Sequence, residues 1–373
     1  MKDSKIPMRI AMIGQKGIPA TYGGIERHVE EVGKRLTQRG HEVYVYSRAH
    51  YTKVRGRYQG IHLIRLPSVN TKHLDTASHC MFASIDMIFR NFDIVHFHAL
   101  GPSVFSLLPR IFGKKSVVTI HGLDWQRQKW GQFASWILKR CEYPAIRFPN
   151  RTIVVSKTLR DYFGSKFSTK PDIIPNGTNL PVFREASKIR RKYKLEPGDF
   201  ILFVGRLVPE KGCHYLIEAF NKVATSKKLV FAGGSSFSDS YARELKKSES
   251  EKIRFLDYVY GDELEELWSN AYIVAQPSTL EGLSISLLEA MSYGRCIVTS
   301  DIPENLEVVG DNAVPFKSGD PDDLSQKLEL LLGNEELVRS YEKRTKQFVT
   351  EKYSWEKIVD STEAIYKEIL SAK

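Results

Sequence analysis

The stretch RIAMIG, residues 9–14, sets how the chain begins to fold. Its apolar run ends at Gly14, a glycine-rich loop follows, and apolar residues then recur at helical spacing between 25 and 36. A second apolar run occupies residues 42–46. The repeating unit of a doubly wound parallel sheet is a buried strand, a loop, a helix and another strand. The opening of the chain therefore predicts an α/β fold.

The stretch FILFVG, residues 200–205, begins the second half in the same way. It also ends at a glycine, and a charged loop and a helical pattern follow it. We therefore predict two Rossmann-like doubly wound parallel-sheet domains that face a cleft, joined within the polar stretch 175–198. The remaining strand-like runs are residues 61–66, 94–97, 116–120 and 152–155 in the first half, and 228–232, 253–256, 273–276 and 296–299 in the second.

The composition is that of a folded soluble protein. The chain has 373 residues, of which 42% are hydrophobic and 27% charged, which excludes a disordered or fibrous chain. No apolar run approaches the roughly 20 residues that span a bilayer, and the N-terminus does not read as a signal peptide. The four cysteines form no CxxC pair, so we expect no zinc site or disulfide framework and a cytoplasmic location.

The positive charge is concentrated in the first half of the chain. Residues 1–180 hold 28 basic and 12 acidic side chains, whereas residues 181–373 hold 27 basic and 32 acidic ones. This asymmetry suggests an anionic partner such as a phosphate, a membrane surface or a nucleic acid, although solubility alone also explains it. Mixed basic and apolar stretches such as WILKR, residues 136–140, suggest peripheral binding to the inner face of an anionic membrane.

Two loops that follow predicted strands could bind phosphate. Gly23 and Gly24 directly precede a helix, where free N–H groups and the helix dipole favour an anion. Arg206 and Lys211 follow the strand at 200–205, and two fixed cations could neutralise a diphosphate leaving group. The alternatives are an ordinary turn at the glycines and a solvated surface loop at the cations.

A pair of glutamates and a histidine follow two further strands. Glu281 and Glu289 are eight residues apart, about 12 Å if that span is helical, and carboxylates bind sugar hydroxyls well. Glu289 has apolar neighbours, so we expect it to be at least partly buried. His121 could hydrogen-bond a sugar hydroxyl or be a structural histidine, and metal binding by His96 and His98 is disfavoured.

These motifs resemble those of nucleotide-sugar-dependent, retaining glycosyltransferases of family 4, which have the GT-B fold. The most specific is EGLSISLLEAMSYG at 281–294, and GRLVPEKG at 205–212 and IPNG at 174–177 stand at the expected places. The segments 14–32 and 121–131 resemble a rhamnosyltransferase-like subgroup. The resemblance covers nearly the whole chain. It implies an N-terminal acceptor-side domain at 1–180, a donor domain at 181–352, and a helix at 353–373 that crosses back.

The resemblance also implies roles for particular residues. Arg206 and Lys211 would hold the donor diphosphate. The chain departs from the family at Ser284, where many members carry a glycine beside the donor sugar. Front-face attack, in which the leaving phosphate helps to take the acceptor proton, needs no protein nucleophile and no metal. The other donor contacts would be Glu281 and His121 on the sugar, Glu289 on the ribose, Gly23 and Gly24 on the phosphates, Tyr258 and Val259 near the base, and Gly282, Leu283 and Ser284 at the helix start.

We therefore expect a hexosyltransferase-type enzyme that moves a sugar from a nucleoside diphosphate to an acceptor hydroxyl. A carbohydrate or lipid-linked acceptor, in cell-surface polysaccharide or glycolipid synthesis, fits the resemblance. The alternatives are another GT-B enzyme (a nucleotide-sugar epimerase or a phosphorylase), a basic nucleic-acid-binding protein and a non-catalytic relative. No recognisable nucleic-acid-binding motif supports the nucleic-acid-binding alternative. Asp320-Pro321-Asp322 looks like a turn before a helix, not a metal-binding DxD.

Overall fold

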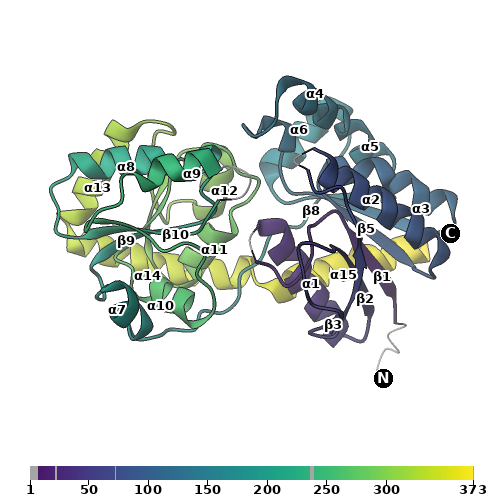
Figure 1. The fold of residues 1–373 in the computed structure, drawn as a ribbon, viewed down its shortest axis with the longest axis horizontal. Coiled ribbons are helices and arrows are strands. Elements are labelled where there is room, and N and C mark those ends of the chain that lie inside the picture. Colours follow the sequence, from purple (N-terminus) through teal and green to yellow (C-terminus); the bar gives the residue numbers. More distant parts are fainter. Residues whose placement is uncertain (1–6, 22, 72, 236–238, 373) are drawn as a thin grey trace. The chain divides into compact units, whose positions relative to one another are not determined.

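The computed structural model describes residues 7–21, 23–71, 73–235 and 239–372, and it divides the chain into two units. Unit 1 comprises Met1–Asn176 and Trp355–Lys373, and unit 2 comprises Gly177–Ser354. Each unit is a parallel sheet covered by helices (Figure 1). The expected fold class of two Rossmann-like α/β units is therefore confirmed.

The sheet of unit 1 has the strand order β3-β4-β2-β1-β5-β6-β7-β8, and only β3 is antiparallel to its neighbour. The central strand β1 is buried along almost its whole length, which explains its continuous apolar sequence. Chain order reverses between β1 and β5, so the ends of these strands form the switch point where ligands bind in such sheets. The strands are β1 (Arg9–Ile13), β2 (Glu42–Arg48), β3 (Gly56–Tyr58), β4 (Ile61–Leu66), β5 (Ile94–His98), β6 (Lys115–Ile120), β7 (Arg151–Val154) and β8 (Asp172–Ile173).

The last helix, α15 (Trp355–Ser371), packs in unit 1 although the chain reaches it only after unit 2. Its apolar side chains share one core with α1 (Gly24–Gln38) and the central strands. Arg39, the residue that directly follows α1, also forms ion pairs with Glu356, Asp360 and Glu363. The other helices of unit 1 are α2 (Leu74–Asp86), α3 (Leu107–Ile111), α4 (Gln132–Arg140), α5 (Glu142–Arg147), α6 (Lys157–Phe167) and the short 3-10 helices η1 (Met87–Phe89), η2 (Gly101–Ser106) and η3 (Asp124–Gln126).

The sheet of unit 2 is entirely parallel in the order β11-β10-β9-β12-β13-β14, with its switch point between β9 and β12. Its strands are β9 (Phe200–Val204), β10 (Lys228–Ala232), β11 (Ile253–Phe255), β12 (Ile273–Gln276), β13 (Cys296–Ser300) and β14 (Val314–Phe316). Its helices are α7 (Lys188–Tyr193), η4 (Pro209–Lys211), α8 (Cys213–Lys222), α9 (Asp239–Lys246), α10 (Asp262–Asn270), α11 (Ile285–Ser292), α12 (Pro303–Val309), α13 (Pro321–Leu332) and α14 (Glu335–Lys352).

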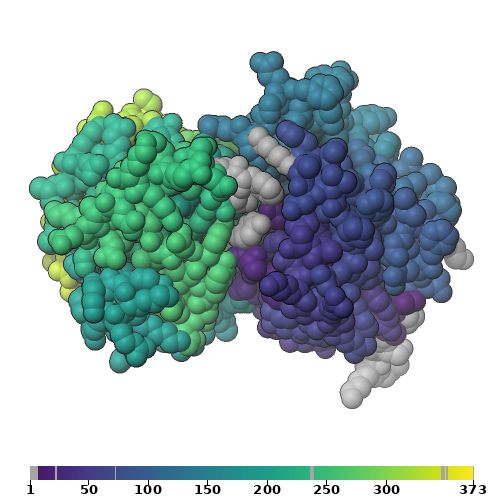
Figure 2. All heavy atoms as spheres, viewed as in Figure 1, coloured from purple at the N-terminus to yellow at the C-terminus, as the bar shows by residue number. Residues whose placement is uncertain are grey.

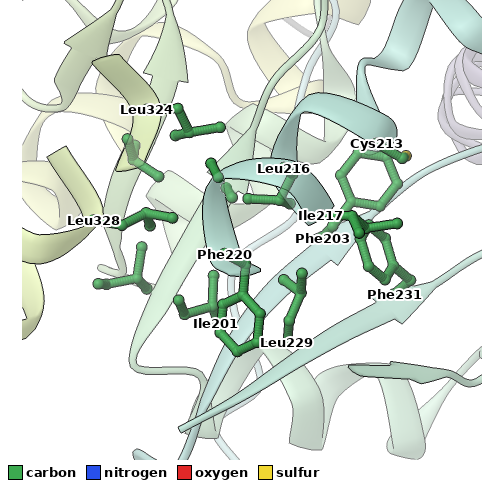
Figure 3. Packing of buried hydrophobic residues seen from close by; sticks show 14 of the residues in the cluster. Ile201, Phe203, Cys213, Leu216, Ile217, Phe220, Leu229, Phe231, Leu324 and Leu328 are labelled. Carbon is green, nitrogen blue, oxygen red and sulfur yellow. The ribbon is translucent and has the colours of Figure 1, made fainter. Parts of the chain in front are cut away.

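The core of unit 2 joins the strands to the helices on one face of the sheet. Figure 3 shows Ile201 and Phe203 of β9 and Leu229 and Phe231 of β10 beneath side chains of α8 and α13. This apolar layer holds the opening strand of the unit rigidly, so the loop that follows β9 starts from a fixed point.

Three smaller predictions concern the cysteines, Asp320 and membrane-spanning helices. All four cysteines are free and buried, and burial raises the pKa of the Cys80 thiol to about 12. Asp320 caps α13 by accepting hydrogen bonds from the backbone N–H groups of Asp322 and Asp323, both at 3.1 Å. Among the described residues, no helix combines the length and the apolar character that a bilayer crossing requires.

Candidate functional site

A glycine brings the Lys211 loop against the end of β12. Gly212 has φ +68°, and a Cβ atom there would lie 2.0 Å from the carbonyl oxygen of Pro277. The backbone N–H of Thr279 donates to the carbonyl oxygen of Glu210 at 2.9 Å, which ties the two loops together. Because any other residue at 212 would be strained and would clash, the glycine fixes Lys211 at the switch point of unit 2.

Lys211 and Glu281 form an ion pair that is largely shielded from solvent. Nζ of Lys211 lies 2.5 Å from Oε1 of Glu281, and their side chains are 13% and 10% exposed. Burial raises the pKa of Glu281, but the charge and hydrogen bond of Lys211, with smaller contributions from Ser278 and Arg206, outweigh it. The pKa of Glu281 therefore lies below its usual range, and the carboxylate is charged at neutral pH.

Gln276, the last residue of β12, organises the polar groups around Glu281. Its Nε2 donates to Oε1 of Glu281 at 2.8 Å and also lies within hydrogen-bond distance of Oγ of Ser278 and of Ser284, at 2.9 and 3.1 Å. Ser284 in turn caps α11 by accepting from the N–H of Leu287 at 3.4 Å. One buried amide thus links the carboxylate to the start of α11.

The two predicted glutamates do not lie on one continuous helix. Since α11 begins at Ile285, Glu281 belongs to the preceding loop and the helical spacing that we used does not apply. Glu289 lies within α11 and is half-buried, as its apolar neighbours predicted. Gly282 and Leu283 connect the glutamate loop to the capping serine, and the Leu283 side chain is buried.

Tyr258 is connected to the Arg206 loop through Gly234. The hydroxyl of Tyr258 lies 3.1 Å from the carbonyl oxygen of Gly234, and its ring leaves no room for a side chain at that position. The N–H of Leu207 donates to the same carbonyl at 2.9 Å, so the loops after β9 and β10 are joined. Val259 is buried beside Tyr258. The structure therefore places the predicted diphosphate and base residues on neighbouring loops of unit 2.

In unit 1, Gly23 caps α1 without any side-chain hydrogen bond, and Gly24 is the first residue of the helix. Gly23 has φ +106°, and a Cβ atom there would lie 2.1 Å from Oε2 of Glu26. Glu26 also accepts a hydrogen bond from the backbone N–H of Lys16 at 3.0 Å. The glycine is therefore required in part because the helix's own carboxylate folds back against the loop.

His121 belongs to a group of three histidines at the switch point of unit 1. Nδ1 of His98, at the end of β5, lies 3.2 Å from Nε2 of His121, which directly follows β6. His28 of α1 packs edge-on against His121 with 4.9 Å between ring centroids, and its Nδ1 lies 3.0 Å from Oδ1 of Asn176. Burial is the main cause that lowers all three pKa values, that of His28 to about 4. These imidazoles are therefore neutral at pH 7.

His28, His98 and His121 are also the group within the described ranges that could hold a metal ion. Their ligand atoms lie within 4.8 Å of one another, and neutral imidazoles bind transition metals well. Asn176 would fix the His28 ring, as second partners of metal-binding histidines do. His96 takes no part, because its ring nitrogens face the hydroxyls of Tyr366 and Thr119 at 2.6 and 2.7 Å.

Two models of known protein families together match most of the chain. Residues 22–181 match the family described as Glycosyltransferase Family 4, and residues 185–348 match Glycosyl transferases group 1. The chain belongs to the family 4 glycosyltransferases. The fold of this glycosyltransferase is the GT-B fold, as the resemblance implied.

Full-length relatives of this glycosyltransferase carry several activities in their names. It is 29% identical to an uncharacterized glycosyltransferase of Methanocaldococcus jannaschii, over 96% of this chain and 98% of that protein. It is 25% identical to the alpha-maltose-1-phosphate synthase of Mycolicibacterium smegmatis, over 97% of this chain and 100% of that protein. Its fold is similar to that of HepE from Anabaena in a complex with UDP-glucose, with a TM-score of 0.81, 18% identity, and coverage of 98% and 100%.

Sequence reasoning missed two groups of the glycosyltransferase that the structure places beside the predicted residues. Gln276 reads as the end of an apolar strand, and only folding brings it to Glu281 and Ser284. Glu304 of α12 was missed as well: burial raises its pKa, and the negative charge of Glu281 adds to the effect. A carboxyl group with a raised pKa next to an ionised one marks a functional region.

Proposed function

We propose that this glycosyltransferase transfers a hexosyl group from a nucleoside-diphosphate sugar to an acceptor hydroxyl. The observation that carries the proposal is the shielded Lys211–Glu281 pair at the switch point of unit 2, within the field of Arg206. Cations there suit a diphosphate, and a charged carboxylate suits the hydroxyls of a sugar. Family membership and the UDP-glucose complex of HepE support the same donor class.

In this proposal the donor's phosphate and sugar contact different ends of one ion pair. An ammonium has three N–H donors, and the pair with Glu281 uses one, so Lys211 can bind a phosphate oxygen while still holding the carboxylate. Arg206 offers a planar fork for the other phosphate oxygens. Glu281 would accept from sugar hydroxyls, Glu289 from the ribose, and the loop at Tyr258 would lie against the base.

The neutral histidine group suits hydroxyl recognition in unit 1. A neutral imidazole both donates and accepts, so His121 would bind a sugar hydroxyl without adding charge near a departing diphosphate.

We further propose that the N–H groups at Gly23 and Gly24 contact phosphate, that the acceptor is a carbohydrate or lipid-linked, and that the enzyme belongs to the rhamnosyltransferase-like subgroup. Cell-surface polysaccharide or glycolipid synthesis would use such an activity.

We propose retention of configuration by front-face attack. The bond from the anomeric carbon to the phosphate oxygen breaks with its electrons going to the diphosphate, and the acceptor oxygen bonds to that carbon on the same face. The acceptor proton passes to the leaving phosphate. Arg206 and Lys211 stabilise the charge that develops, which a metal ion supplies in other enzymes. Asp320 caps α13 by accepting two backbone hydrogen bonds, which supports the interpretation of the DxD match as a turn before a helix.

Calorimetric titration tests the proposal first. UDP, GDP, dTDP and ADP are titrated separately with EDTA present, and we expect one of them to bind in the micromolar range. Lys211→Ala should weaken that binding at least about 100-fold. Lys222→Ala, which removes an exposed ion pair with Asp322, should leave it unchanged. Failure of all four nucleotides to bind, with and without Mg²⁺, would overturn the proposed donor site.

Product analysis then separates transfer from its rivals. A free nucleoside diphosphate plus a new α-linked glycoside supports retaining transfer from an α-linked donor. Epimerised free sugar, or a sugar phosphate formed from inorganic phosphate, would instead identify an epimerase or a phosphorylase. Activity lost with EDTA and restored by Mn²⁺ would contradict the metal-free mechanism and direct attention to the three-histidine group of unit 1.

A further inference from the structure

The exposed apolar side chains are concentrated on one part of unit 1. Of the 21 large hydrophobic side chains that are exposed in the described parts of the chain, 13 lie between residues 74 and 143. Phe89, Phe133 and Ile111 are 84%, 74% and 65% exposed. A soluble monomer rarely leaves so many apolar groups together in water, so this concentration indicates a surface that is covered in use.

The elements that carry these side chains pack on one another. Helices α2, α3 and α5 all contact η2, and a side chain at Gly101 of η2 would touch Leu138 of α4. Figure 1 shows these helices together on one side of the sheet of unit 1, and Figure 2 shows their blue and teal segments adjoining on the surface. We call this surface, formed by α2, η1, η2, α3, α4 and α5, the apolar-basic face.

Helix α4 is the most exposed element of this face. None of its nine residues is buried. Phe133 and Trp136 stack with 6.3 Å between ring centroids, and Ile137 continues the same ridge. The guanidinium of Arg140 lies 5.3 Å from the Trp136 ring, and Lys139 lies over Trp125 at 4.7 Å. Aromatic rings flanked by cations are typical of side chains that enter a membrane–water interface.

The part of this face formed by residues 101–151 carries a positive charge. Residues 101–151 contain nine basic side chains and two acidic ones. Of the acidic pair, Asp124 forms an ion pair with Arg127 at 3.1 Å, and Glu142 is fully buried against Lys166 and Trp125. The exposed charge around α3, α4 and α5 is therefore cationic. In α2 and η1 the acidic groups are Asp75, which is buried, and Asp86, which pairs with Arg90.

We infer that the apolar-basic face docks on an anionic phospholipid surface, with the α4 ridge inserted among the headgroups. A second copy of the chain fits less well, because a symmetric contact would place the same cations opposite one another. Adsorbed basic side chains gain from the negative surface potential of such a membrane, and the aromatic ridge gains from burial. The use of this docking to present a lipid-linked acceptor rests on the proposed function, whereas the docking itself does not.

Vesicle sedimentation of the full chain tests the inference. Vesicles contain either phosphatidylcholine alone or phosphatidylcholine with about one third phosphatidylglycerol, at low and at high salt. We expect at least about tenfold stronger binding to the anionic vesicles, reduced by salt. The triple variant Phe133→Ala, Trp136→Ala and Ile137→Ala should lower that binding about tenfold or more, and Lys139→Glu with Arg140→Glu should remove the preference for anionic lipid.

Matched controls come from unit 2. Leu330→Ala removes a side chain that is also exposed, and Lys247→Glu reverses an exposed charge, and both should bind vesicles like the unchanged chain. Equal binding to neutral and anionic vesicles, or unchanged binding by the triple variant, would overturn the inference. A third outcome would also overturn the inference: the unchanged chain self-associates, does not bind vesicles, and loses its self-association in the triple variant. That outcome would identify a second copy of the chain as the partner of this surface.

Nucleotide titration of the same samples keeps this test separate from that of the proposed function. A chain that binds a nucleoside diphosphate but not anionic vesicles refutes only the docking surface. A chain that binds anionic vesicles but no nucleotide refutes only the donor site. The α4 variants should keep nucleotide binding, because α4 belongs to unit 1 and the Lys211–Glu281 pair to unit 2.

Discussion

The two switch points of this protein stabilise buried polar groups in opposite ways. In unit 1, burial keeps His28, His98 and His121 neutral and packed on one another. In unit 2, the ion pair with Lys211 keeps Glu281 ionised in spite of its burial. The same sheet architecture thus holds uncharged polar groups in one unit and an ion pair in the other. Under the proposed function, His121 and Glu281 would both bind sugar hydroxyls, and Lys211 would bind the diphosphate.

The largest expected effect is on the charged pair. Lys211→Ala removes one partner of a shielded ion pair and leaves Glu281 without its main counter-charge, a change that costs roughly 3–5 kcal/mol in buried pairs. We expect nucleoside diphosphate binding to weaken at least about 100-fold, measured by calorimetry. The double variant Lys211→Met with Glu281→Gln should recover the stability but not the binding. Recovery of binding would show that the charges serve only the fold.

Acid should destabilise unit 1 before unit 2. The pKa of His28 is about 4 in the folded chain and near 6.5 when unfolded, so between these values the unfolded chain binds more protons. Stability from this group is complete above about pH 6.5 and is lost as the pH falls toward 4, by up to ~3 kcal/mol. Glu281, whose pKa is lowered, loses its contribution only at lower pH.

Amide hydrogen exchange at pH 7, 6 and 5 separates the two units. Protection in β5 and β6 should fall with pH while protection in β9 and β12 changes little. His28→Asn should flatten the pH dependence of unit 1, because it removes a group that must stay unprotonated. Parallel loss of protection in both sheets would contradict the assignment of acid sensitivity to the histidines.

The two units also differ in which of their features could be predicted from the sequence. Strands at 9–14 and 200–205 are readable because a parallel strand buried on both faces is continuously apolar and ends at a glycine. The contact between Lys211 and Glu281 could not be predicted from the sequence, because 70 residues separate them and the positive φ of Gly212 is what lets the Lys211 loop lie against the end of β12. Gln276 was missed although it is only five residues from Glu281, because it stands at the end of an apolar strand and gives no polar pattern. The 12 Å spacing of Glu281 and Glu289 depended on a helical span between them, but Ser284 caps α11 and the helix begins only at Ile285.

Gln276→Leu should produce a moderate effect. The substitution keeps the size of the side chain but removes a hydrogen bond to Glu281 and contacts to two serines. Leaving buried polar groups unsatisfied costs about 1–3 kcal/mol, so we expect kcat/KM for the intact donor to fall roughly tenfold or more. Binding of the nucleoside diphosphate alone should change little, because Gln276 touches the sugar-side carboxylate and not the cations.

Ser286→Ala is the matched control for Gln276. The hydroxyl of Ser286 makes only a weak contact with the same amide, at 3.4 Å from Oε1, and it lies 3.0 Å from Oγ of Ser284, so this variant leaves the bond between Gln276 and Glu281 in place. The variant should stay within about twofold of the unchanged chain. If Ser286→Ala and Gln276→Leu lower kcat/KM equally, the serine cluster as a whole, and not the amide bonded to Glu281, determines activity.

The smallest expected effect is at Ser284, where fold and function can be separated. Its hydroxyl caps α11, so Ser284→Ala should cost about 1 kcal/mol in the free energy of unfolding, and Ser284→Gly only a few tenths. Urea unfolding measures that difference. If the side chain serves only as a cap, the alanine variant will be the less active of the two. If Ser284 also contacts the donor sugar, both variants should change the preference among donor sugars, and the stable glycine variant should show that change most clearly.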